Sequence, residues 1–170
     1  MNNKLAKYII IVVIAFAIDS TIFYFLKHDT KGITIIPYIG LMLWTLLNNE
    51  IIDDDRYIFA SSVGAYYAIV YANSLLIYVL LYGIYAFFGR RYMKLSKFTL
   101  FEAMIVIVLT IFVQEVVIYW LMWITNVTAI SFMHFSLYRL LPTLLCNTIL
   151  SIPLYYLHKK IGHEGKKNAY

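Results

Sequence analysis

The feature that most constrains this chain is a series of long apolar segments separated by short polar ones. The longest, Thr99–Trp123, is as long as a membrane-spanning helix, which needs about 20 predominantly apolar residues. Hydrophobic residues make up 62% of the chain and charged residues 14%, whereas soluble domains have about 45–50% and about 25%. The composition therefore excludes an ordinary soluble domain. It also excludes a disordered chain, which requires low hydrophobicity and high charge.

Six apolar segments predict an all-α, polytopic bundle of six transmembrane helices, which forms a single integral membrane domain over residues 1–170. The first apolar run, interrupted by Asp19, is longer than the hydrophobic core of a signal peptide. No small-residue cleavage site follows it, so we expect a retained helix. Only Asn73 and Ser74 join the third and fourth segments, which predicts a tight turn and an antiparallel pair. The predicted spans are about residues 8–26, 33–47, 57–72, 74–88, 99–123 and 140–157.

The short segments between the spans predict the orientation, because cytoplasmic loops are enriched in Lys and Arg. With the N-terminus in the cytoplasm, eleven of the 14 Lys and Arg residues lie on the cytoplasmic side. The outside holds Lys27 and Lys31, with Arg139 at the outer edge of the sixth span. The net charge of +5 is therefore interpreted as a topology signal and not as a nucleic-acid site. The aromatic stretch Ile130–Tyr138 predicts a short helix at the outer membrane interface.

Small residues recur at a spacing of four along the third predicted span, at Ala60, Gly64, Ala68 and Ala72. On a helix these residues line one face, which lets another helix approach closely. The stripe has two interpretations. It is either an internal packing face of the bundle or a docking face for a partner helix, and the pattern alone does not decide between them.

Charged residues inside a membrane are costly and mark function or internal pairing. Asp19, Glu115 and Arg139 fall in the outer half of the predicted bundle, so we expect a structural ion pair between Arg139 and either Glu115 or Asp19. A proton or ion pathway is the alternative. Asn147 lies between two prolines on the sixth span, where each proline frees a backbone carbonyl. We expect Asn147 to donate to such a carbonyl or to make an interhelical hydrogen bond.

The sequence contains no pattern typical of an enzyme, a cofactor site or a metal site. Cys146 is the only cysteine, and the histidines do not stand at zinc-ligand spacing. The carboxylates that follow Glu50, at Asp53, Asp54 and Asp55, form a contiguous run, which is more typical of a solvated loop than of a magnesium site. No phosphate-binding glycine loop is present.

The C-terminal third, "SFMHFSLYRLLPTLLCNTILSIPLYYLHKKI", resembles the C-terminal signature of the MreD family of rod shape-determining membrane proteins. The segment "DDDRYIFASSVGAYYAIVYANSLLIYVLLYG" is similar to the central helix pair of the family, and "FAIDS" resembles its first span. Many members carry an acidic residue shortly after the glycine that matches Gly64, and this chain has none there. The matching motif residues are Arg139, Leu140, Leu141, Pro142, Thr143 and Asn147.

The resemblance implies a non-enzymatic scaffold of the elongation and peptidoglycan-synthesis machinery in the bacterial cytoplasmic membrane. It implies binding to an MreC-like single-span protein, in the company of a penicillin-binding transpeptidase, a RodA-type glycosyltransferase and MreB. The family is also similar in fold to the substrate-binding components of energy-coupling-factor vitamin transporters, which supplies an alternative function. Those components typically dock through an alanine groove on the first span. Here that span reads "IAFAIDSTIFY", without such a stripe, so the scaffold is favoured.

Overall fold

The computed structural model describes residues 3–29, 32–51, 55–72, 75–92 and 99–167, and all of its regular structure is helical. Three helices are long and apolar enough to cross a bilayer, over Leu5–Phe25, Leu100–Ile124 and Phe132–Ile161, and two shorter apolar helices accompany them. The chain is therefore a multi-pass membrane protein. In order, the elements are α1 (Asn3–Asp29), α2 (Ile39–Asn48), α3 (Asp55–Tyr67), the π-helix η1 (Ala68–Ala72), α4 (Leu75–Tyr92), α5 (Leu100–Ile124), α6 (Phe132–Phe135), the π-helix η2 (Ser136–Leu140) and α7 (Leu141–Lys167).

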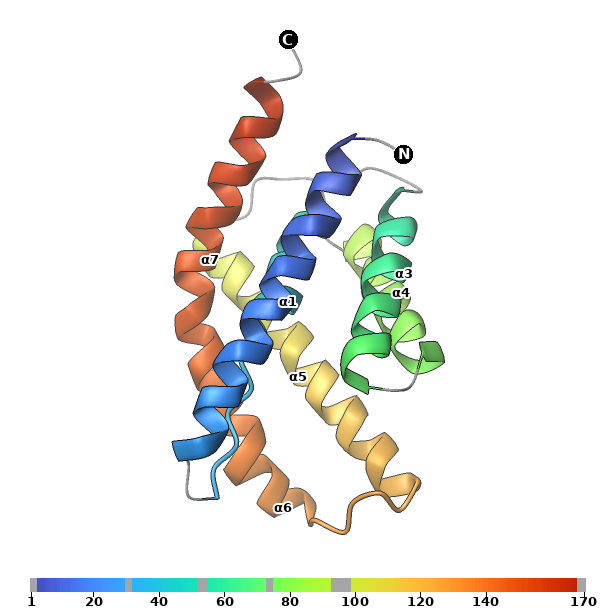
Figure 1. Cartoon of the computed structure of the whole chain (residues 1–170), viewed down its shortest axis with the longest axis vertical. Helices are drawn as coiled ribbons and strands as arrows, with labels where there is room; N and C mark the ends of the chain where they lie inside the picture. The colour runs from blue at the N-terminus through green and yellow to red at the C-terminus, as the bar shows by residue number, and fades with distance from the viewer. Residues whose placement is uncertain (1–2, 30–31, 52–54, 73–74, 93–98, 168–170) are drawn as a thin grey trace.

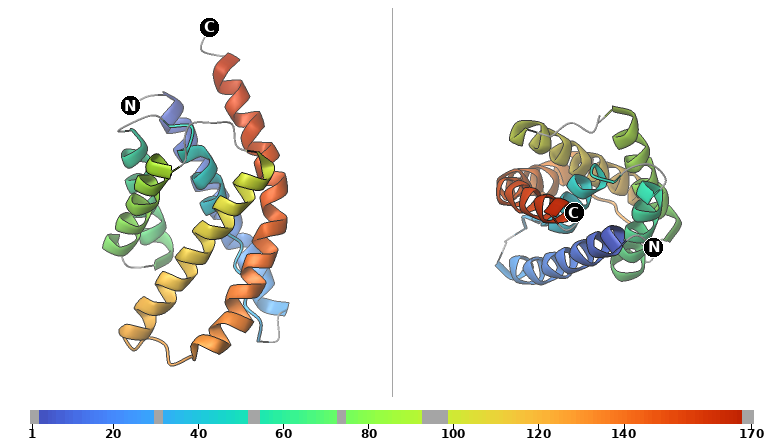
Figure 2. Two further views of the ribbon diagram at one scale, coloured as in Figure 1. Left: turned by 180° about the vertical axis from the view of Figure 1, so that it is seen from behind. Right: turned by 90° about the horizontal axis from the view of Figure 1, so that it is seen from above.

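Both termini lie at one end of the bundle (Figure 1). At the opposite end, α1 finishes, α5 finishes and α6 begins. The predicted antiparallel pair is present, since α3 and α4 run side by side (Figures 1 and 2). The turn predicted at Asn73 and Ser74 lies outside the described residues. The end of the bundle that contains α6 is called the α6 end below.

The second predicted span, residues 33–47, is only partly helical, so that boundary was wrong. Residues 32–38 form no helix, with a bend at Gly32, and the helix that follows, α2, has 10 residues. Pro37 accounts for the late start, because a proline disfavours helical backbone at the residue before it and has no N–H of its own. At about 1.5 Å per residue, α2 covers roughly half of the hydrocarbon thickness. We call Gly32–Tyr38 the extended segment.

Helix α2 is the centre of the bundle. Every residue from Gly40 to Asn48 is buried, and seen from above the helix lies inside the ring made by α1, α5 and α7 (Figure 2, right). Trp44 of α2 packs against Tyr82 of α4, with ring centroids 4.7 Å apart. Non-helical backbone at membrane depth is tolerated where protein surrounds it. The end of the extended segment satisfies that condition, since Pro37 and Tyr38 are buried, whereas its first residues, Gly32 and Ile33, are exposed.

A short helix is observed within the predicted segment Ile130–Tyr138: it is α6, which Ser131 caps by accepting a hydrogen bond from the His134 N–H. It runs through η2 directly into α7. The last helix is therefore longer than the predicted span over residues 140–157, and Pro153 lies inside it. At the start of α5, Thr99 and Glu102 form a reciprocal capping box, which fixes where that helix begins.

Candidate functional site

The described members of the small-residue stripe on α3 and η1 are buried within the bundle. Ala60, Gly64 and Ala68 are buried, and a Cβ added to Gly64 would lie 2.9 Å from the Tyr78 carbonyl oxygen of α4. The side chain of Ala72 lies outside the described part. For its described members the stripe is an internal packing face, and the prediction of a partner-binding groove on this face is corrected accordingly. Close approach of the neighbouring helix fills the groove that a partner would need.

Two Gly→Ala substitutions measure this packing. Gly64→Ala places a methyl group against backbone of α4, so the helices must separate, and we expect a loss of about 1–3 kcal/mol in unfolding free energy. Gly83→Ala on α4 meets nothing within 4 Å. It should be neutral or stabilise by about 0.5–1 kcal/mol, since alanine favours helix more than glycine. Unfolding in mixed micelles of increasing sodium dodecyl sulfate compares the two, and equal effects would contradict the packing.

The partner of Arg139 is Glu115. Its Nε donates to Glu115 Oε2 at 2.9 Å and its Nη2 donates to Oε1 at 3.4 Å. The hydroxyl of Tyr38 donates to the same Oε1 at 2.6 Å. The side chain of Glu115 is fully buried, whereas that of Arg139 is 33% exposed. The carboxylate therefore joins three separate parts of the chain: α5, η2 and the end of the extended segment.

Asp19, which was the other candidate partner of Arg139, binds backbone N–H groups instead. Its two carboxylate oxygens accept the backbone N–H groups of Ile39 at 2.7 Å and Gly40 at 2.8 Å. These are the first two residues of α2, where backbone N–H groups have no partner within the helix and the helix dipole favours negative charge. Asp19 thus caps α2 from α1, a neighbouring helix. A cap supplied by a residue 20 positions away has no local sequence signature.

Pro142 and Tyr138 anchor the start of the extended segment. Proline has no N–H, so Pro142 cannot donate to the Tyr138 carbonyl four residues before it. The N–H of Thr34 donates to that carbonyl at 2.8 Å. The extended segment therefore satisfies the carbonyl that Pro142 leaves without a donor. One of the two expectations for Asn147 was that it would donate to such a carbonyl, and at Pro142 it does not.

Asn147 and Thr143 hold the rest of the extended segment against α7. The Asn147 amide donates to the Ile36 carbonyl at 2.8 Å, and its oxygen accepts the Tyr38 N–H at 2.8 Å. Thr143 Oγ1 accepts the Ile36 N–H at 3.3 Å. A strand-like backbone needs partners along its length. One face of α7 provides them, where a neighbouring strand would in a sheet.

Glu50 belongs to a second polar contact that the sequence did not predict. The hydroxyl of Tyr8 donates to Glu50 Oε2 at 2.7 Å, and Nε2 of His158 lies 2.8 Å from Oε1. Glu50 had been assigned to a solvated acidic loop, yet it links α1 to α7 near the end of the bundle that holds the termini. Its position beside three further acids concealed this role, because runs of charge are typical of loops.

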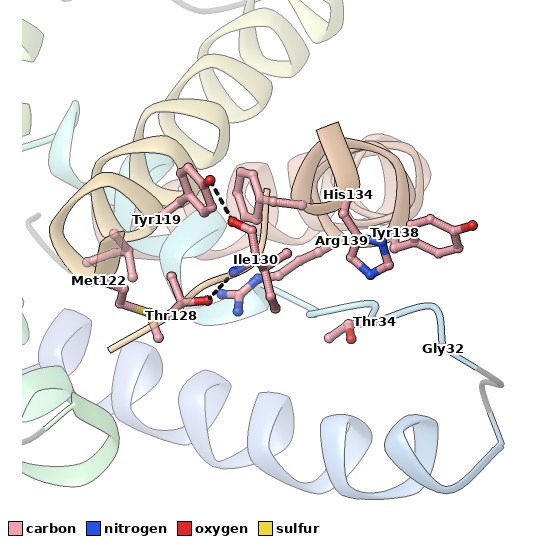
Figure 3. A pocket seen from close by; sticks show the side chains of 11 residues that line it. Gly32, Thr34, Tyr119, Met122, Thr128, Ile130, His134, Tyr138 and Arg139 are labelled. Carbon is pink, nitrogen blue, oxygen red and sulfur yellow. Dashed lines mark hydrogen bonds between the residues drawn. The ribbon is translucent and has the colours of Figure 1, made fainter. Parts of the chain in front are cut away.

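A cavity of about 250 Å³ opens at the α6 end, between α5, the loop after it, η2 and the extended segment (Figure 3). Arg139 reaches it from η2, and the hydroxyls of Thr34 and Thr128 line it. The Tyr119 hydroxyl donates to the Ile130 carbonyl at 2.9 Å, which closes the loop over one side. Sequence reasoning identified Arg139 but missed the cavity, because its lining comes from segments that are far apart in the chain. The described residues that line it are Gly32, Thr34, Ile118, Tyr119, Met122, Thr128, Ile130, His134, Phe135, Tyr138 and Arg139.

Comparison with protein-family models, with curated proteins and with solved structures finds no match to this chain. The residues themselves are thus the basis for any functional assignment. They are arranged as one polar layer, formed by Asp19, Glu115, Arg139, Thr143 and Asn147, around the extended segment and the start of α2.

Proposed function

We propose that this protein is a non-enzymatic membrane scaffold of the MreD type, which binds an MreC-like single-span protein in the elongation machinery of a bacterial cell. Its mechanism is positioning, since a rigid bundle fixes where a partner helix enters the membrane. The transpeptidase, the RodA-type glycosyltransferase and MreB would be reached through that partner. Six transmembrane helices, in an arrangement similar to that of energy-coupling-factor substrate-binding components, belong to this proposal.

The observation that carries the proposal is the common role of the motif residues. Arg139, Pro142, Thr143 and Asn147 are the residues on which the resemblance rests, and all four act on the extended segment or on its neighbour Glu115. A sequence signature that specifies one structural element is what a scaffold requires. Each polar group of this layer has a hydrogen-bond partner within the bundle, which favours rigidity over chemistry.

The same proposal places both termini in the cytoplasm of a bacterial cytoplasmic membrane. The ends of the chain lie together in the structure (Figure 1). The segments at that end contain most of the Lys and Arg residues, as the positive-inside rule requires of a cytoplasmic side. The α6 end would then face outward, toward the wall-facing domain of the partner.

With the stripe on α3 filled, the partner surface is better sought at the α6 end, in the predicted interfacial segment and beside it. Four exposed side chains form what we call the aromatic face: Trp120, Trp123, Phe132 and Met133. Trp120 contacts both Trp123 and Phe132, with ring centroids 5.5 and 6.5 Å apart. Exposed aromatic and methionine clusters are enriched in protein interfaces.

Co-purification with an MreC-like protein tests the proposal. We expect the wild-type chain to retain that partner in detergent, and the double variant Trp123→Ala, Met133→Ala to retain roughly tenfold less, as for the loss of interface hot spots. The matched control is the double variant Leu145→Ala, Ile149→Ala. Both of these side chains are exposed on α7, and neither belongs to the aromatic face. Failure of the wild-type chain to retain the partner would reject the scaffold.

The alternative function, a vitamin-binding transporter component, is supported by the cavity at the α6 end. At about 250 Å³ the cavity is smaller than the roughly 300–1,000 Å³ typical of sites for drug-sized ligands. The scaffold is therefore the better supported of the two. Thermal-shift measurements with a panel of vitamins distinguish them, since stabilisation by one vitamin would favour the transporter.

A further inference from the structure

We infer that the cavity at the α6 end binds an anionic group, a phosphate or a carboxylate, which Arg139 and the hydroxyls around it recognise. The inference does not depend on the proposed scaffold function. The anionic group has two sources that share this chemistry: the headgroup of a membrane lipid and a small soluble compound.

Among the described residues that line the cavity, Arg139 carries the formal charge. None of the described residues that line it carries a carboxylate, and the counter-ion Glu115 lies beneath the surface with a fully buried side chain. A ligand in the cavity therefore meets the guanidinium and not the carboxylate. Nε and Nη2 are directed to Glu115, and the guanidinium also lies over the Phe135 ring, 6.0 Å from its centroid. A ligand would add to these contacts. Arginine suits this double role because its five N–H donors are fixed in one plane.

Polar side chains surround the guanidinium on the cavity side. Figure 3 shows the side chains of Thr128 and Thr34 at the cavity, with Arg139 between the two segments that carry them. Thr128 Oγ1 accepts the Ile130 N–H at 3.3 Å, so its own O–H can donate to a ligand. His134 stacks on Tyr138 with ring centroids 4.3 Å apart, which fixes the imidazole at the edge of the cavity. Donors of this kind, arranged around one cation, favour an oxyanion.

Apolar side chains also line the cavity, and this extends the inference from an ion to the group that bears it. Ile118, Met122 and Phe135 are among them, and they can contact the glycerol or hydrocarbon adjacent to a phosphate. The exposed Trp120 and Trp123 are close by on α5, and tryptophans are enriched at the level of lipid headgroups. The cavity volume of about 250 Å³ suits a headgroup-sized ligand and not an entire lipid.

The obvious variant, Arg139→Ala, also breaks the ion pair and can prevent folding. A cavity-filling variant avoids this difficulty. Thr128→Phe blocks the cavity while it leaves Arg139 and Glu115 in place, and Val127→Phe adds the same side chain at a neighbouring position that is exposed and does not line the cavity. Both variants should unfold near the wild-type midpoint in the absence of ligand.

Two binding measurements on the purified full-length chain distinguish the sources. Native mass spectrometry measures retention of phosphatidylglycerol against phosphatidylcholine, and thermal unfolding in a neutral detergent measures stabilisation by glycerol 3-phosphate and by acetate. We expect at least one of these probes to bind the wild type and Val127→Phe with equal affinity. The same probe should bind Thr128→Phe roughly tenfold more weakly, as for the loss of one charge-assisted contact. Retention of the lipid identifies a headgroup, and stabilisation by a soluble anion identifies a small compound. Absence of binding by every probe, or binding that Thr128→Phe leaves unchanged, would overturn the inference.

Discussion

Arg139→Ala is expected to lower the free energy of unfolding by about 3–5 kcal/mol, the cost of removing one partner from a buried ion pair. Glu115 is fully buried and would lose the two contacts that Arg139 makes. The Tyr38 hydroxyl alone would remain as its partner in this contact. Because Glu115 connects α5 to η2 and to the extended segment, we expect the loss to separate these elements. The measurement is unfolding in sodium dodecyl sulfate, together with protein abundance in membranes.

A charge swap separates this pairing from a general need for charge. Arg139→Glu combined with Glu115→Arg should recover part of the lost stability, because the two side chains still face each other. The corresponding swap of Arg139 with Asp19 should not, since Asp19 binds the first N–H groups of α2 and not Arg139. Rescue by the Asp19 swap, or by neither swap, would contradict the observed pairing.

Asn147→Leu is expected to have an effect of similar size, about 2–6 kcal/mol. Leucine has the same branched shape, with methyl groups in place of the amide oxygen and nitrogen, and leaves the Ile36 carbonyl and the Tyr38 N–H without the partners they now have. Each buried backbone group that loses its hydrogen bond costs about 1–3 kcal/mol. The extended segment should detach from α7, and hydrogen exchange of the Tyr38 amide should accelerate.

Thr148→Val provides the control for this variant. The Thr148 hydroxyl donates to the Leu144 carbonyl within α7, so its removal leaves the extended segment untouched. We expect little change in stability and none in exchange at Tyr38. If Asn147→Leu behaves like Thr148→Val, the amide does not hold the extended segment.

Hydrophobic periodicity and length predicted the parts of this fold that the bilayer dictates. The long apolar segments became α1, α5 and the last helix, and the charges that interrupt them became internal contacts. The choice between Glu115 and Asp19 as partner of Arg139 was left open by the sequence. The identity of the partner depends on how each helix is rotated about its own axis. A segment that is apolar on all of its faces does not specify that rotation.

The extended segment shows why the remainder could not be predicted. Its residues are as apolar as a span, so hydropathy indicated a helix, and Pro37 was the single local signal against one. Its hydrogen-bond partners, Tyr138, Thr143 and Asn147, lie about a hundred positions away in the chain. The small-residue stripe had a similar ambiguity, because internal and external packing faces need the same residues. Only the position of α4 distinguishes them.

Site-specific photo-crosslinking in membranes tests whether this chain positions a single-span partner at the α6 end. A photoreactive residue at Met133, which is 71% exposed, is compared with one at Leu145, which is 68% exposed on α7. We expect a crosslink from Met133 to a single-span protein with a wall-facing domain, and none to that protein from Leu145. A crosslink to that partner from Leu145 alone, or from neither position while the partner is present, would contradict this expectation.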